Sequence, residues 1–335
     1  MPKKAKTLLI QSLKVLFSIG LIYWLVGSGR LEFRSLGKLL TFPFLLIGFL
    51  CVGIGLAIGV QRWRQFLHSQ NLSISFITGM KLTLIGMFFN FAVPGGVGGD
   101  LVKGYYIAQA TPHAKISAAL TILMDRLIGL FAMLVIALAM MTYRWDIVSA
   151  SKELMVIFQM LSLLLLAFLA LWAQIFSRRL YELKWVDTIF RRLPKGAVLQ
   201  RTYEYLMLYR NHKNTFLITF CLSIAAQIFS VLFFIAAGYG MGYSEMPLSV
   251  YFFVIPIGMM VQAIPVSPAG VGVGQAATYF LFNTVSPGSG PIGAAVTTAS
   301  QIVQFCFGLI GAYFYLGISK KLKTSAPQTP EMEQA

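Results

Sequence analysis

Long runs of apolar residues, separated by short polar stretches, dominate this sequence. Six runs are long enough to cross the roughly 30 Å of hydrocarbon in a bilayer, which takes about 20 helical residues. They cover residues 8–26, 39–60, 116–143, 154–176, 216–237 and 292–318. The run at 8–26 has the weakest pattern because Lys14 interrupts it. The pattern predicts an all-α, polytopic transmembrane bundle with about six full spans.

Clusters of proline and glycine interrupt two further apolar stretches. Pro94-Gly-Gly-Val-Gly98 matches Pro268-Ala-Gly-Val-Gly272 when the prolines are aligned. Inside a membrane, such a broken backbone is tolerated only where protein or a water-filled cavity covers it. The flanking helices are too short to span, so we expect two re-entrant hairpins, over about 74–110 and 249–284, that enter from opposite faces. Paired breaks of this kind are typical of inverted-repeat transporters with a midplane site.

Composition supports an integral membrane protein. Hydrophobic residues make up 57% of the chain and charged residues only 11%, against about 25% charged in soluble domains. The net charge of +16 does not indicate nucleic-acid binding, because the basic residues lie in short loops beside apolar spans. With the N-terminus inside, 20 Lys and Arg residues fall on the inner side and five outside. We therefore expect both termini in the cytoplasm and the bundle in the plasma (inner) membrane.

The chain is expected to form one integral membrane domain over 1–323, followed by a disordered tail at 324–335. The basic segment 177–214 is predicted to be cytoplasmic, either as amphipathic helices on the inner leaflet or as a solvated linker. The basic N-terminus resembles the start of a signal peptide. No small-residue cleavage site follows Val26, which favours a retained span.

Sequence motifs for catalysis are missing. The three histidines form no metal-ligand spacing, no Ser/His/Asp or Cys/His arrangement is evident, and no Gly-Lys-Ser/Thr phosphate loop occurs. We expect no enzymatic activity, no cofactor and no metal.

Charges within the apolar segments are the first candidates for function, because a buried charge is costly unless it is paired. Asp100 and Asp125 are the acidic residues in such segments, with Lys103 and Arg126 as candidate partners. Asp100 and Lys103 share a helix face at i, i+3 spacing. The pairs Asp100–Lys103 and Asp125–Arg126 then either hold the first hairpin to the third span or take part in binding an anionic head group.

The glycine breaks offer a second kind of candidate. A helix that begins after Gly98 presents free N–H groups, which form a ready anion site unless Asp100 caps the helix itself. Gln275 follows the second break where a charge would be expected, and Gln262, Gln301 and Gln304 add uncharged polar groups. The candidate substrate-binding residues are Asn90, Pro94, Gly96, Gly98, Asp100, Lys103, Asp125, Arg126, Pro268, Gly270, Gly272 and Gln275.

These motifs resemble a known membrane family. Asn90 with Pro94-Gly-Gly-Val-Gly-Gly-Asp100 and Lys103 is similar to the first motif of the lysylphosphatidylglycerol-synthetase transmembrane-region family, also called flippase-like proteins. Asp125-Arg-Leu-Ile-Gly129 and Pro268-Ala-Gly-Val-Gly-Val-Gly-Gln275 resemble two further motifs. Family members often have Arg at the position of Lys103 and Glu at that of Gln275, so this chain keeps the first charge and lacks the second.

The resemblance implies the lipid-translocating part of such proteins without the aminoacyltransferase domain, since nothing after Lys323 could form it. The expected function is to move a phospholipid or lipid-linked anion between leaflets, with the head group in a polar cavity at the breaks and the acyl chains in the bilayer. The alternative is a non-transporting membrane partner of a separate lipid-modifying or glycosyl-transferring enzyme, docked on 177–214. The oligomeric state is left open.

Overall fold

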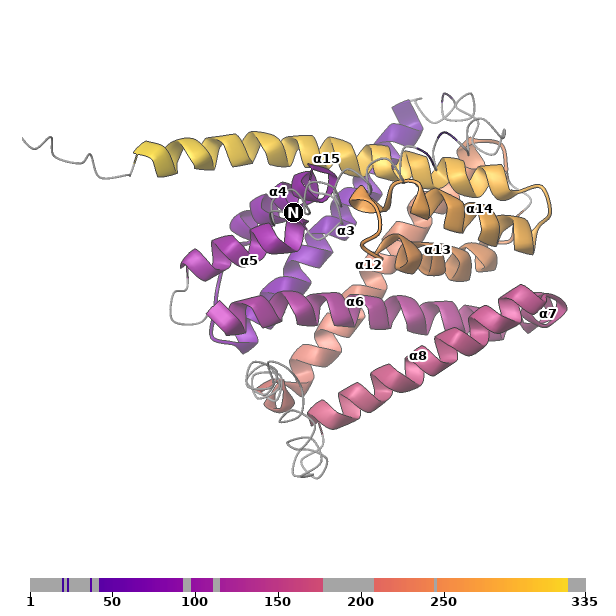
Figure 1. The fold of residues 1–335 in the computed structure, drawn as a ribbon, viewed down its shortest axis with the longest axis horizontal. Helices are drawn as coiled ribbons and strands as arrows, with labels where there is room; N and C mark the ends of the chain where they lie inside the picture. Colours follow the sequence, from indigo (N-terminus) through magenta and orange to yellow (C-terminus); the bar gives the residue numbers. More distant parts are fainter. Residues whose placement is uncertain are drawn as a thin grey trace, which may run out of the picture.

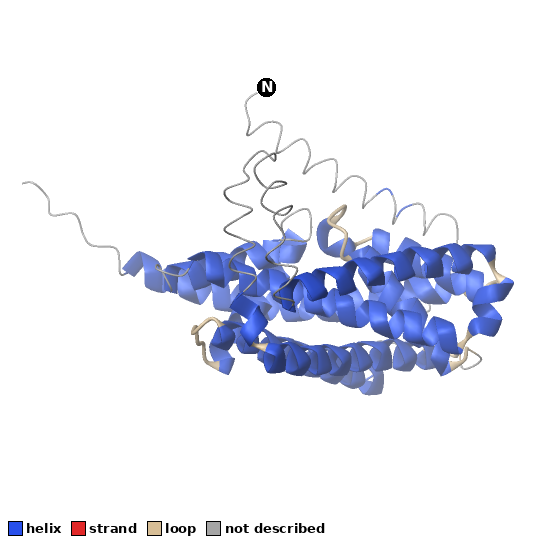
Figure 2. Cartoon of the chain, turned by 90° about the horizontal axis from the view of Figure 1, so that it is seen from below, coloured by secondary structure: helices blue, strands red, loops and turns tan. Residues whose placement is uncertain are grey.

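The computed structural model describes residues 42–92, 98–110, 115–176, 208–243 and 246–324, together with Gly20, Tyr23 and Gly37. Figure 2 shows helices and connecting loops in these ranges and no strand. The elements are α3 (Phe42–Ser69), α4 (Phe76–Ala92), α5 (Gly98–Ala110), α6 (Lys115–Tyr143), α7 (Trp145–Ala150), α8 (Lys152–Phe176), η1 (Leu208–Asn211), α12 (Lys213–Gly240), α13 (Leu248–Gln262), η2 (Pro268–Gly270), α14 (Val273–Val285) and α15 (Gly290–Thr324). The predicted all-α fold is confirmed.

Five described helices are long and apolar enough to cross a membrane. They are Leu46–Ser69, Ile116–Tyr143, Lys152–Phe176, Lys213–Gly240 and Gly290–Gly317. These correspond to five of the six predicted spans, and the sixth, at 8–26, lies outside the described residues. Most of the basic segment 177–214 and the tail after Thr324 also lie outside them, so the predictions for these segments remain predictions.

The second predicted span ends too early. Helix α3 continues nine residues beyond Val60, to Ser69. Its buried residues Val60, Trp63 and Leu67 keep the three- and four-residue spacing of a helix face, so apolar packing holds this part of the chain helical. The extension places Arg62 within the helix bundle rather than in a loop.

The two breaks separate short helices that form two hairpins. Helices α4 and α5 pack against each other, as do α13 and α14. Figure 1 shows the α4–α5 pair and the α13–α14 pair at opposite ends of the space between α15 and α6. In each pair one helix packs on α15 and the other on α6. The predicted hairpins are thus present as helix pairs, and the membrane face that each enters remains a prediction.

The hairpins belong to two four-helix units with matching order. Pro94 and Pro268 lie 174 positions apart, and this one offset carries α3–α6 onto α12–α15 with helix starts that agree to within three residues. The packing corresponds as well, because α4 lies on α15 as α13 lies on α6, and α5 lies on α6 as α14 lies on α15. We call α3–α6 the first unit and α12–α15 the second unit.

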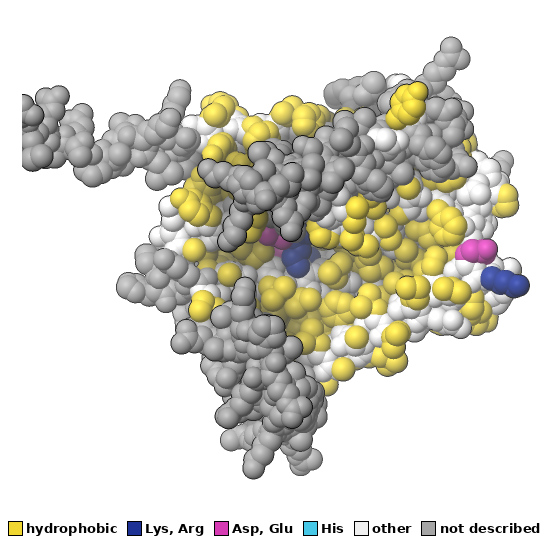
Figure 3. All heavy atoms as spheres, viewed as in Figure 1, with side chains coloured by type: hydrophobic (Ala, Val, Ile, Leu, Met, Phe, Trp, Pro, Cys, Tyr) yellow, Lys and Arg dark blue, Asp and Glu magenta, His cyan; other side chains and the backbone are white. Residues whose placement is uncertain are grey.

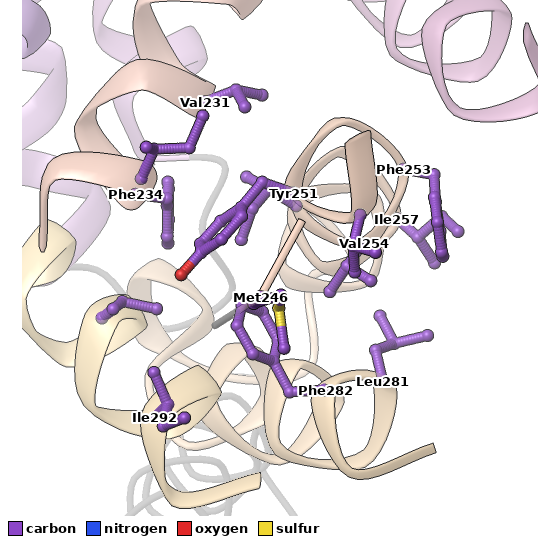
Figure 4. Packing of buried hydrophobic residues seen from close by; sticks show 14 of the residues in the cluster. Val231, Phe234, Met246, Tyr251, Phe253, Val254, Ile257, Leu281, Phe282 and Ile292 are labelled. Atoms are coloured by element: carbon purple, nitrogen blue, oxygen red, sulfur yellow. The ribbon is translucent and has the colours of Figure 1, made fainter. Parts of the chain in front are cut away.

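The largest buried cluster surrounds the second hairpin. Figure 4 shows Tyr251 and Val254 of α13 facing Phe282 of α14, with Val231 and Phe234 of α12 beside them. Helix α13 is buried on nearly all sides, which is typical of a central helix. In α8, by contrast, only 11% of the most apolar stretch of the helix is buried inside the protein. This helix therefore turns most of its apolar surface outward.

Candidate functional site

The first hairpin brings α4 and α5 to backbone contact. The Asn90 side-chain oxygen accepts a hydrogen bond of 2.8 Å from the Gly99 N–H, so Asn90 satisfies a donor that the helix start leaves free. A Cβ added at Gly99 would lie 2.6 Å from the Gly86 carbonyl oxygen, which requires glycine at this approach. Gly98 is the buried first residue of α5. Pro94 and Gly96 lie in 93–97, outside the described residues.

The ion pairs differ from those expected from sequence. Asp100 does not pair with Lys103 one turn along its own helix. Its carboxylate accepts a hydrogen bond of 2.7 Å from Arg126 Nε of α6, with side-chain exposures of 27% for Asp100 and 44% for Arg126. The i, i+3 rule predicts a pair within α5, but the packing of α5 on α6 brings a guanidinium within closer reach.

Asp125 likewise pairs away from its sequence neighbour. Arg62 of α3 donates from Nε and a terminal nitrogen to the two Asp125 oxygens, at 2.6 and 3.0 Å. Residues 125 and 126 are adjacent in a helix and point in different directions, so they cannot form the expected pair. Arg62 also donates to the Ser223 hydroxyl at 3.1 Å, and thus joins α3 to α6 and α12.

Arg62 was missed from sequence because it follows the predicted end of a span. The signal that could have found it is the helical spacing from Val60 through Trp63 to Leu67. Gly129 of the motif Asp125-Arg-Leu-Ile-Gly129 also has a role here, since a Cβ at that position would lie 3.2 Å from a terminal nitrogen of Arg62. The small residue leaves room for the guanidinium.

Lys103 forms no ion pair with a described residue. Its ammonium lies 5.0 Å from the centre of the Trp63 ring, a cation–π contact. The Trp63 indole N–H donates to Thr121 at 3.1 Å, which fixes the ring. This cluster holds three basic residues, Arg62, Lys103 and Arg126, and two acidic ones, Asp100 and Asp125. The one excess positive charge favours the binding of an anion.

The second break has a sharply turned backbone. Pro268 begins η2, and the φ angles of Ala269, Gly270 and Gly272 are 48°, 71° and 83°. A Cβ at Gly270 would overlap the Gln262 side chain and lie 2.6 Å from its carbonyl oxygen. The Gln262 amide donates to the Ala269 carbonyl at 3.2 Å and ties the end of α13 to the turn. Glycine at 270 is therefore required by the turn itself.

Gln275 lies in a buried hydrogen-bond network rather than in open space. Its oxygen accepts from the Gly272 N–H at 2.8 Å, and its nitrogen donates to Gln301 at 2.7 Å. The side chain is 1% exposed. These contacts give it a role in closing the start of α14 against α15.

A cavity of about 230 Å³ lies where the two hairpins meet. Asn90 and Phe91 line it from the end of α4, beside the first break, and Ala269 and Gly270 from the second break. Arg126 lines it from α6. Figure 3 shows basic and acidic side chains together in the middle of a largely hydrophobic face, with a second such group at its right edge. Of the candidate residues, the cavity brings together Asn90, Arg126 and Gly270, while Lys103, Asp125 and Gln275 do not line it.

The arrangement suits an anion better than a metal. In the described ranges, no three His, Cys, Asp or Glu side chains lie close enough to hold a metal ion. Arg126 uses only Nε for Asp100, and no described group accepts from its terminal nitrogens. A guanidinium with free donors at the wall of a cavity can bind a carboxylate or phosphate oxygen.

The helix bundle and its paired hairpins define a polytopic helical membrane protein. The sequence profile of the family described as "Lysylphosphatidylglycerol synthase TM region" matches residues 11–312, and the chain belongs to this family. It is 24% identical over 308 residues to a UPF0104 membrane protein of Pyrococcus horikoshii, covering 84% of this chain and 89% of the relative. A UPF0104 membrane protein of Methanothermobacter thermautotrophicus is also 24% identical, over 336 aligned positions that cover 92% and 93% of the two chains. No solved structure matches the chain significantly.

Proposed function

We propose that this protein moves a lipid or lipid-linked anion between the leaflets of the plasma (inner) membrane, with both termini in the cytoplasm. The observation that carries the proposal is the cavity at the meeting point of the two hairpins, with Arg126 in its wall. Paired breaks around one central site are the arrangement that alternating-access transporters use. The family's description names a lipid synthase, which fits a lipid as the substrate class.

Binding in this mechanism exchanges one counter-ion for another. The anionic head group accepts hydrogen bonds from the terminal nitrogens of Arg126, which Asp100 does not use. It can also displace Asp100 from Arg126 Nε. A released Asp100 carboxylate then has Lys103 one turn further along α5, at the i, i+3 spacing that allows a pair. The site stays close to neutral through the exchange, which lowers the cost of moving charge within the membrane.

Reconstituted vesicles test the proposal. Purified protein is placed in vesicles with fluorescent phosphatidylglycerol, and transbilayer movement is followed by quenching from outside. Arg126→Gln should slow movement roughly tenfold to hundredfold, because a hydrogen bond to a charged group contributes about 1.5–3 kcal/mol. Arg144→Gln is the matched control, since Arg144 pairs with Asp146 and contacts Ser249 away from the cavity. Equal rates for the two variants would contradict the proposal.

A separate enzyme partner is the second candidate, because the family is named for the membrane region of a synthase. In that case, the purified protein alone moves no lipid, whatever the variant. A lipid-modifying or glycosyl-transferring enzyme would then copurify with the chain and lose activity without it.

A further inference from the structure

A second cavity adjoins the one at the hairpins. It has a volume of about 260 Å³ and lies among α3, α4, α12, α13 and α15. Five residues line both cavities, which makes them neighbours that share a wall: Met87, Phe234, Met259, Ser300 and Gln304. Each cavity is smaller than the range of about 300–1,000 Å³ usual for ligand pockets, and the two joined reach that range.

The second cavity differs from the first in chemistry. Its own lining residues include Val52, Leu56 and Phe233, and it has no charged side chain. The Ser230 hydroxyl donates to the Ala226 carbonyl within α12, and Gln304 donates to the Ser300 hydroxyl within α15. The hydrogen bonds of Ser230 and Gln304 thus stay within their own helices, and most of the other lining side chains are apolar and suited to hydrocarbon. We call it the apolar cavity.

We propose that the two cavities form one site for an amphiphile, with its anionic group at Arg126 and a single hydrocarbon chain in the apolar cavity. This rests on the proposed function and narrows its substrate class. It replaces the expectation that all chains stay in the bilayer. Apolar cavities tend to stay dry and to take apolar ligands. The volume of the apolar cavity, about 260 Å³, is below the usual size of a ligand pocket, which favours one chain over two.

Two glycines of α3 allow a matched test. A Cβ added at Gly55 or at Gly59 meets nothing within 4 Å, so both positions accept the first carbon of a side chain without a clash. The two residues lie one turn apart on the same helix, and only Gly55 lines the apolar cavity. Gly55→Leu therefore fills the cavity, while Gly59→Leu controls for replacing a helix glycine by leucine.

The measurement is binding of octyl, dodecyl and hexadecyl phosphate to the purified full chain in a non-ionic detergent, followed by thermal stabilisation. Affinity should rise with chain length in the unaltered protein and in Gly59→Leu. Gly55→Leu should bind the longer phosphates roughly tenfold more weakly, the effect of losing about two buried methylene groups. If Gly55→Leu folds poorly, Ala226→Leu fills the same cavity from α12.

The outcomes separate this proposal from the proposed function. Equal affinities for Gly55→Leu and Gly59→Leu, or stabilisation by inorganic phosphate equal to that by dodecyl phosphate, would overturn the chain site. If lipid movement then still depends on Arg126, the proposed transport function stands without the chain site. Chain-length dependence that Gly55→Leu removes, in a protein that moves no lipid, would leave the site in place and reject the transport function.

Discussion

The two four-helix units share their helix order and packing, yet they differ completely in charge at the site. The first-unit residues Arg62, Asp100, Lys103, Asp125 and Arg126 correspond, at the common offset, to Ala236, Gly274, Ala277, Ala299 and Ser300. Helices of the second unit pack in the same way without any of these charges. The comparison shows that this helix order and packing can form without such charges, which supports our proposal that the first unit uses them in binding.

The two proline–glycine breaks also differ in the charge and exposure of the groups beside them. At the second break, Gln275 and Gln301 are 1% and 5% exposed and hydrogen-bond to each other, so this end is closed by uncharged groups. At the first, the Asp100–Arg126 pair is partly exposed and Arg126 faces the cavity. In our proposal, one unit thus supplies a rigid, neutral wall and the other an exchangeable ion pair.

The largest expected effect concerns the pair Arg62–Asp125, whose side chains are only 15% and 16% exposed. Arg62→Met or Asp125→Leu alone should lower the free energy of unfolding by up to about 3–5 kcal/mol, the cost of breaking a buried pair, because each leaves an unpaired and largely buried charge. The double variant should regain most of this loss, since the second unit packs with Ala236 and Ala299 at these positions. Thermal or denaturant unfolding in detergent measures all three. If the double variant is as unstable as the single variants, the fold itself requires the Arg62–Asp125 pair.

The next effect tests the second break. Gly270→Ala should destabilise by about 1–3 kcal/mol or more, because alanine at this positive φ is strained and its Cβ meets Gln262. Gly59→Ala is the control and should have the opposite effect on stability. Alanine in place of a helix glycine with open space around it should raise the free energy of unfolding by up to about 1 kcal/mol. Unfolding midpoints of the two variants give the comparison. Stability unchanged in Gly270→Ala would mean that the turn can relax, and that the wall is less rigid than we describe.

Sequence predicted most of the architecture, because apolar runs of span length and proline–glycine breaks are local signals. Five spans and both helix pairs were found in this way. It failed on the ion pairs, because spacing within one helix says nothing about which neighbouring helix brings a charge closer. Asp100 meets Arg126 through the packing of α5 on α6, and Asp125 meets Arg62 through the packing of α3 on α6. The two breaks led us to expect a polar cavity between them, but the apolar cavity beside it depends on tertiary packing and has no sequence signal.

The smallest effect on stability, and the sharpest test of the exchangeable pair, is Asp100→Asn. A partly exposed ion pair contributes about 0–1 kcal/mol, so the loss of stability should stay within that range. Removing the competing carboxylate should at the same time strengthen dodecyl phosphate binding by up to about fivefold, the equivalent of the same 1 kcal/mol. Asp146→Asn is the control. Hydrogen bonds from Arg144 lower the pKa of the Asp146 carboxyl, and this ion pair lies away from both cavities. Its loss should leave phosphate affinity unchanged. Weaker binding in Asp100→Asn would show that Asp100 positions Arg126 for the anion instead of competing with it, and the exchange of counter-ions would have to be abandoned.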